Sequence, residues 1–281
     1  MIELGKFYNL KVTRITDLGY MVSDSKEEVL LHFSQSLSEH EIDSNVHIFI
    51  YSDKKERKTA TEIEPFVTLD KPGFVKVVDK ISGVGVFVNI NTPKDVLISK
   101  DNLPYKESEW PNIDDTLFVS LKIKKNSLLA KPLNRFDIIA LHKNVRYAEK
   151  ELVSGYISKV SDKGVGIISK DMMYIFVPRM LYRESYRLGQ EVTVEITKEL
   201  EEEYYGTLNQ HKELMIDTDR EIILNFLKNN NGTMKLTAKS SAEEVYELLK
   251  MSRKAFKRAY GGLYKDELIT FDDTTTKLIK K

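Results

Sequence analysis

Four basic residues near the C-terminus are the side chains best suited to bind a polyanion. Arg253, Lys254, Lys257 and Arg258 recur at helical spacing, and no acidic residue occurs between residues 248 and 265. Apolar residues in the same segment form a separate helical stripe, which places the four cations away from the core. Such a cluster can neutralise phosphates and release counterions. A solvated helix face is the alternative interpretation.

A second candidate lies upstream, where aromatic and basic residues interleave. Seven of them fall within 14 positions: Tyr174, Phe176, Arg179, Tyr182, Arg183, Tyr186 and Arg187. An exposed aromatic ring can stack on a base with a stabilisation of roughly 1–3 kcal/mol, while basic side chains follow the phosphates. We therefore predict nucleic-acid contacts at Tyr174, Phe176, Arg179 and Arg183, and at Lys163 before them. A solvated loop with aromatic core anchors is the alternative.

Residues that would support catalysis are missing or stand at the wrong spacing. The 281-residue chain has no cysteine, which excludes thiol nucleophiles, iron–sulfur clusters and cysteine-ligated zinc. Its five histidines are dispersed, and neither a GxxxxGK(S/T) nor a GxSxG motif occurs. We expect a non-catalytic protein without a metal or other cofactor. A metal-dependent nuclease built from scattered carboxylates stays open as an alternative.

The compartment is predicted from what the sequence lacks. The absence of cysteine fits a reducing environment. No window approaches 18 uninterrupted apolar residues, and the start, MIELGKFYNL, has no basic region followed by an apolar run. We therefore expect a cytoplasmic protein with no membrane partner.

The elements that position the candidate residues recur three times along the chain. Strand-like runs joined by a polar turn and a glycine occur at 10–24, 75–89 and 155–169, and the matching glycines are Gly19, Gly85 and Gly164. Further short strands follow each hairpin, giving five per unit, the pattern of a small closed barrel. We predict a mainly β, multidomain chain with three tandem OB-fold barrels at 1–67, 68–134 and 152–214, and a partly helical linker at 135–151.

The remaining segment, 216–281, changes from strand to helix periodicity. Capping patterns predict helices that begin near Thr218, at Ser240 or Ser241, and at Ser252. A short strand is expected at 234–236, and a hairpin at 267–271 and 274–279. Helix, strand, helix, helix and hairpin form the order of a winged helix, in which the last helix usually reads nucleic acid.

Charge is segregated along the chain although its sum is zero. The 43 basic residues balance the 43 acidic ones. By segment, the net charge is −4 over 1–67, +2 over 68–142, −2 over 143–217 and +4 over 218–281. The overall neutrality therefore does not argue against a polyanionic partner, because the most basic segment is the one that carries the predicted recognition helix.

The first unit resembles the S1 RNA-binding domain, an OB-fold barrel. The residues that carry this resemblance are TRITDLGYMV, LLHFSQ and IYSDKKERKTAT. Three such barrels followed by a winged helix resemble the conserved virulence factor B family of bacterial RNA-binding regulators. The most specific segment is SAEEVYELLKMSRKAFKRAYGGLYKDELI.

The resemblance implies an RNA-binding face in each barrel, made of aromatics beside the hairpin glycine, a histidine in the next strand and a late Asp/Arg pair. In the first unit, His32 matches the histidine, and Asp53 and Arg57 match the pair. Leu18 and Met21 stand where the aromatics are expected. None of the three units carries the complete set.

The other two units match the S1 pattern in fewer places. In the second unit Phe87 matches one aromatic, and Leu97 replaces the histidine. In the third unit Lys163 and Gly166 replace both aromatics, and Phe176 stands at the histidine place. We count His32, Arg57 and Phe87 among the expected nucleic-acid contacts.

The function expected from these patterns is the binding of single-stranded RNA. The resemblance implies a post-transcriptional regulator of bacterial genes, including virulence factors in pathogens. A DNA-binding transcription regulator that uses the winged helix is the first alternative. A protein-interaction scaffold, for example on the ribosome or polymerase, is the second.

Overall fold

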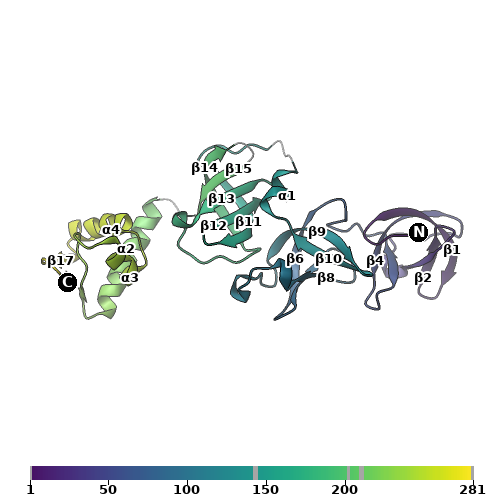
Figure 1. The fold of residues 1–281 in the computed structure, drawn as a ribbon, viewed down its shortest axis with the longest axis horizontal. Coiled ribbons are helices and arrows are strands. Elements are labelled where there is room, and N and C mark those ends of the chain that lie inside the picture. Colours follow the sequence, from purple (N-terminus) through teal and green to yellow (C-terminus); the bar gives the residue numbers. More distant parts are fainter. Residues whose placement is uncertain (1, 142–144, 201–202, 209–211, 280–281) are drawn as a thin grey trace. The chain divides into compact units, whose positions relative to one another are not determined.

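The computed structural model describes residues 2–141, 145–200, 203–208 and 212–279, with the side chains of 212–218 left out (Figure 1). The chain divides into two compact units, residues 1–208 and 209–281. Within the described residues, the first unit holds three closed five-stranded barrels, and the second holds three helices and a small sheet. The predicted fold class, three OB-type barrels followed by a winged helix, is confirmed.

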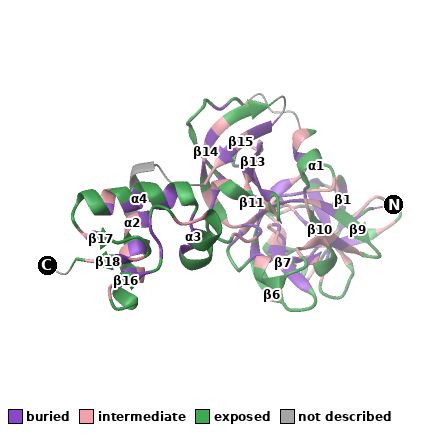
Figure 2. Ribbon diagram, turned by 60° about the vertical axis from the view of Figure 1, so that its left-hand side comes forward, coloured by how far each residue is buried: buried purple, intermediate pink, exposed green. Residues whose placement is uncertain are grey.

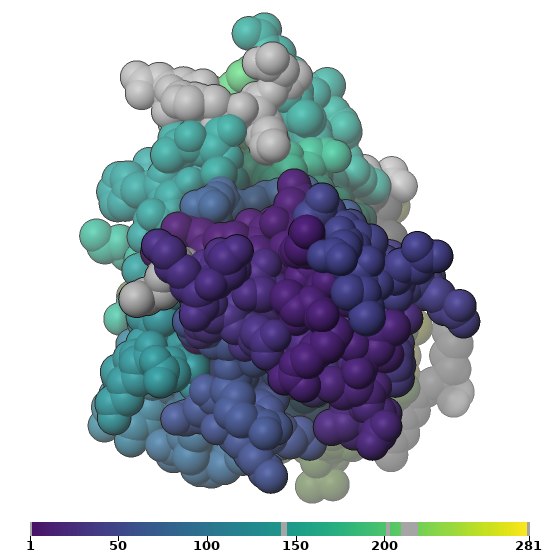
Figure 3. All heavy atoms as spheres, turned by 90° about the vertical axis from the view of Figure 1, so that its right-hand side faces the viewer, coloured from purple at the N-terminus to yellow at the C-terminus, as the bar shows by residue number. Residues whose placement is uncertain are grey.

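Barrel 1 closes in the order β1-β2-β3-β5-β4, with β3 and β5 parallel and the other pairs antiparallel. Core and surface residues alternate along β2 and β3, because successive side chains of a strand point to opposite faces. Figure 3 looks onto this barrel, shown in purple. Its strands are β1 Phe7–Thr16, β2 Gly19–Ser23, β3 Glu28–His32, β4 Asn45–Ser52 and β5 Lys58–Thr61.

Barrels 2 and 3 repeat this topology. The strands of barrel 2 are β6 Gly73–Ile81, β7 Gly85–Asn89, β8 Val96–Ser99, β9 Thr116–Lys124 and β10 Ser127–Pro132. The strands of barrel 3 are β11 Leu152–Ser161, β12 Gly164–Ser169, β13 Tyr174–Pro178, β14 Glu191–Leu200 and β15 Glu203–Thr207. In every barrel a short 3₁₀ helix follows the third strand: η1 Phe33–Gln35, η2 Lys100–Asn102 and η4 Arg179–Leu181.

The three repeated glycines begin the second strand of each barrel. A β-carbon on Gly19 would lie 2.1 Å from the carbonyl oxygen of Leu31, and one on Gly164 would lie 2.2 Å from that of Val177. Gly85 has the same close approach, at 2.1 Å from the oxygen of Ile98. Because no side chain fits there, glycine lets the first hairpin close onto the third strand.

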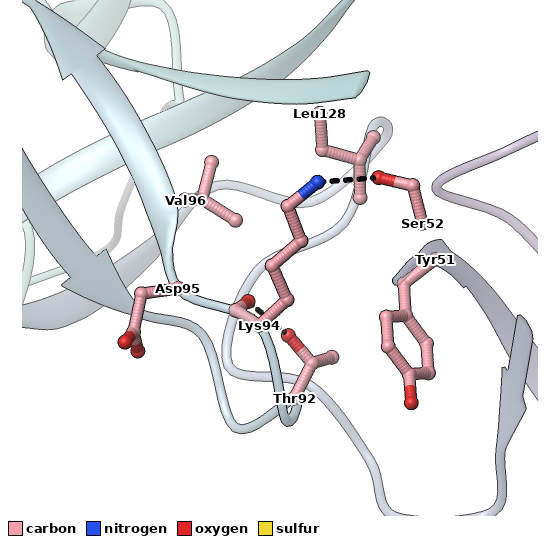
Figure 4. A pocket seen from close by; sticks show the side chains of 7 residues that line it. All are labelled: Tyr51, Ser52, Thr92, Lys94, Asp95, Val96 and Leu128. Atoms are coloured by element: carbon pink, nitrogen blue, oxygen red, sulfur yellow. Dashed lines mark hydrogen bonds between the residues drawn. The ribbon is translucent and has the colours of Figure 1, made fainter. Parts of the chain in front are cut away.

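Barrels 1 and 2 share one hydrophobic cluster, which fixes their contact. Lys94 of barrel 2 reaches across the junction, and its Nζ donates to the carbonyl oxygen of Asp53 at 3.0 Å. A second contact, to Ser52 Oγ at 3.4 Å, is drawn in Figure 4 beside Tyr51 and Leu128. The cavity that these residues line is about 10 Å³, room for one water at most.

Barrels 2 and 3 are joined by a polar clamp and an aromatic contact. Arg187 donates from Nε and Nη2 to the two carboxylate oxygens of Asp115, at 2.7 and 2.9 Å. The ring of Phe74 packs against Phe118 and against Tyr156 of barrel 3. The linker between the barrels contributes helix α1, Arg135–Ile139, in agreement with a partly helical linker.

The second unit has the element order of a winged helix. Ser241 caps α3 with Glu244 as its capping-box partner, and Ser252 caps α4, as two of the predicted helix starts required. The predicted start near Thr218 is wrong, because α2 already begins at Lys212 and Thr218 lies inside it. The elements are α2 Lys212–Asn229, β16 Thr233–Met234, α3 Ala242–Leu249, α4 Arg253–Lys265, β17 Ile269–Phe271 and β18 Thr276–Leu278.

Candidate nucleic-acid interface

Strand pairing identifies the same row of outer-surface residues in every barrel, here called the face row. It starts two residues after the repeated glycine and crosses the second, third and fifth strands, between neighbours that point into the core. The face row is Met21–Leu30–Thr59 in barrel 1, Phe87–Leu97–Leu129 in barrel 2 and Gly166–Phe176–Tyr205 in barrel 3.

The register also corrects which residues stand at the histidine place. His32 pairs with Gly19, and the residues that pair with the two other glycines are Ser99 and Pro178. The sequence-based assignment of Leu97 and Phe176 to this place is therefore wrong by two residues. Apolar strands of similar composition can be aligned in more than one register, whereas the glycine contact allows only one.

Barrel 1 keeps the polar residues of the S1 pattern, and each has a partner within the barrel. His32 is exposed, and its Nδ1 accepts the backbone N–H of Ser34 at 3.1 Å, which caps η1. Arg57 donates from Nε and Nη2 to Asp53 Oδ2 at 2.8 and 2.7 Å. Burial raises the pKa of Asp53, but hydrogen bonds from Arg57 and Lys55 outweigh it and lower the pKa below its usual value.

Barrel 2 presents an apolar face row. Phe87 is half-buried beside Leu97, its partner on β8, and Leu129 on β10 continues the row. The predicted contact residue Phe87 therefore has part of its ring open to solvent. Its neighbours in the row are aliphatic, so they add apolar surface but no second ring.

Barrel 3 carries two aromatic residues in its face row. Phe176 on β13 and Tyr205 on β15 are both half-buried, and their ring centres lie 5.7 Å apart at a steep angle. Gly164 of β12 leaves room for the Phe176 ring, because a β-carbon on Gly164 would come within 2.9 Å of that ring. The aromatics expected on the second strand are thus replaced by aromatics of the third and fifth strands. Tyr205 was missed in the sequence because its strand partner was not known.

The predicted contact at Tyr174 is not accessible. Only 4% of this residue is exposed, and it belongs to a cluster with Phe118, Leu133 and Ile138 from barrel 2 and the linker. Burial raises the pKa of the Tyr174 hydroxyl to about 12. A ring covered in this way cannot stack on a base, so Tyr174 is a core residue of the junction, the alternative considered from the sequence.

The basic residues predicted around η4 lie close together. Arg179 donates its backbone N–H to the carbonyl oxygen of Lys163 at 3.0 Å, which holds η4 against the β11–β12 turn. The side chains of Lys163, Arg179 and Arg183 are all exposed. Arg179 also lies over the Tyr182 ring, 4.7 Å from its centre. Arg187, in the same stretch, instead forms the clamp with Asp115.

The four predicted cations of the tail are all exposed residues of α4. Figure 2 shows that exposed and buried residues alternate along this helix. The opposite side of the helix is buried, through Ala255, Phe256, Ala259, Tyr260 and Leu263. Arg253, Lys254 and Lys257 are exposed. Arg258 differs, because its Nη2 lies 3.7 Å from a carboxylate oxygen of Asp219, whose side chain is fully buried. Arg258 therefore compensates a buried charge within the domain.

The part of the chain that the structure describes holds neither a metal centre nor a membrane-spanning helix. Within the described residues, no group of three or more histidine, aspartate or glutamate side chains is placed to hold a metal ion. None of the described helices is both long enough and apolar enough to cross a membrane.

Family models match three parts of the chain. A model described as "S1 domain" matches residues 4–62, and one described as "CvfB first S1-like domain" matches residues 73–131, which form barrel 2. A "CvfB-like winged helix domain" matches residues 221–278. The barrels, their face rows and the helical domain thus define a multidomain S1 and winged-helix protein.

Relatives of similar length place the chain more narrowly. It is 31% identical over 285 residues to conserved virulence factor B of Staphylococcus haemolyticus, covering 99% of this chain and 95% of the relative. It is 33% identical to the YitL protein of Bacillus subtilis, covering 93% and 89%. The chain belongs to the conserved virulence factor B family.

A solved structure supports this assignment. It comes from Streptococcus pneumoniae and is described as a multidomain protein with nucleic acid binding domains. The TM-score is 0.67 at 25% sequence identity, over 98% of both chains.

Proposed function

We propose that this protein binds single-stranded RNA without catalysing a reaction. The observation that carries the proposal is the aromatic pair Phe176–Tyr205 in the face row of barrel 3. Partly exposed rings on an OB-type barrel can stack on bases, and stacking tolerates any sequence. Lys163, Arg179 and Arg183 add positive charge next to η4, at the end of the strand that carries Phe176.

The winged helix supplies a second contact region. Arg253, Lys254 and Lys257 project from the solvent side of α4 and are suited to phosphates rather than bases. Weak contacts from separate modules of one chain add up because binding at one raises the effective concentration of the other. The S. pneumoniae structure, described as having nucleic acid binding domains, supports a nucleic acid as the partner.

The biological role that fits this activity is regulation of gene expression after transcription, in the cytoplasm. Its basis is family membership, since the staphylococcal relatives carry the name conserved virulence factor B. The structure of the barrels supports the proposed RNA binding but gives no information on the regulatory role.

The direct test is fluorescence anisotropy of the full chain with a labelled 20-nucleotide RNA at several salt concentrations. We expect an affinity that falls steeply with salt, because bound cations displace counterions from the phosphates. Charge reversal of Arg253, Lys254 and Lys257 to glutamate should weaken binding. A chain that binds no RNA even at low ionic strength contradicts the proposal.

A DNA-binding regulator is the second candidate, favoured by the cations on the α4 surface. Competition between duplex DNA and single-stranded RNA of equal length separates the two. Preference for the duplex, together with insensitivity to a Phe176→Ala substitution, would establish the second candidate. If charge reversal on α4 leaves all nucleic-acid binding unchanged, α4 serves another partner, such as a protein.

A further inference from the structure

A groove of about 850 Å³ lies between barrels 2 and 3 and takes its walls from both. Barrel 2 supplies the segment that leads into the 3₁₀ helix η3, Glu107–Glu109, where the side chain of Tyr105 is completely exposed. Barrel 3 supplies the β11–β12 turn and much of the segment 179–190. Neither barrel forms this groove alone.

The two walls are held together by contacts at the base of the groove. Arg187 grips Asp115 through two hydrogen bonds, and the backbone N–H of Leu188 donates to the carbonyl oxygen of Glu109 at 2.9 Å. The side chain of Leu188 is buried in the hydrophobic cluster of barrels 1 and 2. The relative placement of the two walls is therefore fixed before a ligand enters, which lowers the cost of binding.

The groove offers flat surfaces of the kind that bind unstacked bases. Tyr105 stands on one wall, and Arg179 stands on the other. Arg179 is fixed by the ring of Tyr182 and by a hydrogen bond from its Nη1 to the carbonyl oxygen of that residue, at 2.9 Å. Aromatic rings and arginine guanidinium groups are the usual stacking partners of bases in single-stranded RNA.

The charges of the groove favour bases over phosphates. Its ionisable lining residues carry both signs: Lys106, Arg179, Arg187, Glu109, Asp162 and Glu184. Lys106 Nζ lies 3.7 Å from Glu109 Oε1, and Arg187 is bound to Asp115. Part of the positive charge of the groove is therefore already compensated. Carboxylates repel a phosphate chain but accept hydrogen bonds from the amino groups of bases.

We propose that this groove binds unstacked bases of a single-stranded RNA, with one base stacked on Tyr105 and the phosphates outside. The proposal rests on the proposed function and extends it to a site that spans two barrels. It is separate from the face rows, because Tyr105 lies in the loop between β8 and β9 rather than on a strand.

Anisotropy titrations of a labelled 12-nucleotide oligoadenylate with the full chain test the groove. Tyr105→Ala should weaken binding roughly 5- to 150-fold, the range of one lost stacking contact. Tyr105→Phe, which keeps the ring, should bind like the unsubstituted chain. Phe66→Ala is the matched control, because Phe66 is also an exposed aromatic residue and does not line the groove.

The possible outcomes separate the groove from the proposed function. If the unsubstituted chain binds the RNA and Tyr105→Ala binds equally well, the groove proposal is overturned while RNA binding stands, and Tyr105 is left as a surface for a protein partner. If Tyr105→Phe loses as much affinity as Tyr105→Ala, stacking is overturned. If the unsubstituted chain binds no RNA, the proposed function itself fails.

Discussion

Barrels 1 and 3 have the same strand order and the same close glycine contact, yet they present different chemistry on equivalent positions. The face row of barrel 1 is Met21–Leu30–Thr59, and that of barrel 3 is Gly166–Phe176–Tyr205. Barrel 1 keeps the polar S1 residues His32, Asp53 and Arg57. Barrel 3 has lost them but offers two rings.

The difference shows that matched residues and an available binding surface are separate properties. In barrel 1, Asp53 and Arg57 are bound to each other, and His32 caps a 3₁₀ helix, so these groups already stabilise loops. In barrel 3, Gly164 on β12 makes room for the Phe176 ring of the neighbouring strand β13. We therefore expect barrel 3 to contribute more to RNA affinity than barrel 1, which also carries the most negative segment of the chain.

The largest effects should come from the glycines that close the two barrels. Gly19→Ala and Gly164→Ala each place a β-carbon about 2 Å from a carbonyl oxygen, and we expect each to destabilise its own barrel by about 3 kcal/mol. Thermal unfolding measures this loss. RNA affinity should fall strongly for Gly164→Ala and little for Gly19→Ala. Equal losses of affinity in the two variants would contradict the expectation that barrel 3 contributes more to RNA affinity than barrel 1.

The next effect is that of the aromatic face row. Phe176→Ala should weaken the binding of single-stranded RNA by roughly tenfold or more, because one base loses a stacking partner. The matched control is Leu30→Ala, the equivalent position of barrel 1, which should leave the affinity unchanged. Anisotropy measures both. If Leu30→Ala costs as much as Phe176→Ala, the face rows bind alike in spite of their chemistry.

Much of the architecture could be predicted from local patterns. The glycines at matching places, the alternating strands and the capping boxes at Ser241 and Ser252 act within a few residues of themselves, so their signals are visible in the sequence. The helix start predicted at Thr218 was wrong, because a capping pattern is also compatible with a helix interior when the preceding residues extend the helix.

The site was harder to predict, because it depends on contacts between distant segments. Tyr174 and Phe176 look alike in the sequence, and both pack against the cluster formed with the linker and barrel 2. Only Tyr174 is fully covered there, whereas Phe176 lies at the edge and is half-buried. Tyr205 lies beside Phe176 because β13 and β15 pair in parallel, and no local sequence pattern predicts this pairing. Likewise, Arg258 appears equivalent to Lys257 until Asp219 is found beneath it.

A smaller effect should distinguish the arginines of the two barrels. Arg179→Ala should weaken RNA binding about fivefold, because its guanidinium lines the groove, and it should leave the slope of log affinity against log salt unchanged, because the phosphates lie outside the groove. Arg57→Ala should change neither quantity, because the Arg57 guanidinium is bound to Asp53. Titrations at four or more salt concentrations measure the slopes. A slope reduced by about 0.7, the value for one phosphate contact on a single strand, would mean that Arg179 meets a phosphate outside the groove instead of a base within it.

The smallest effect concerns the polar pair of barrel 1 and its response to pH. Because the folded-state pKa of Asp53 is lowered, its stabilisation is present above its usual pKa and is lost as the pH falls through the lower folded-state value. Asp53→Asn should therefore reduce the free energy of unfolding by about 0.5 kcal/mol at pH 7. The difference from the unsubstituted chain should disappear in strong acid, and RNA affinity at pH 7 should not change. Urea unfolding between pH 2 and 7 measures this dependence. A loss of RNA affinity in Asp53→Asn would instead mean that Asp53 and Arg57 take part in RNA binding.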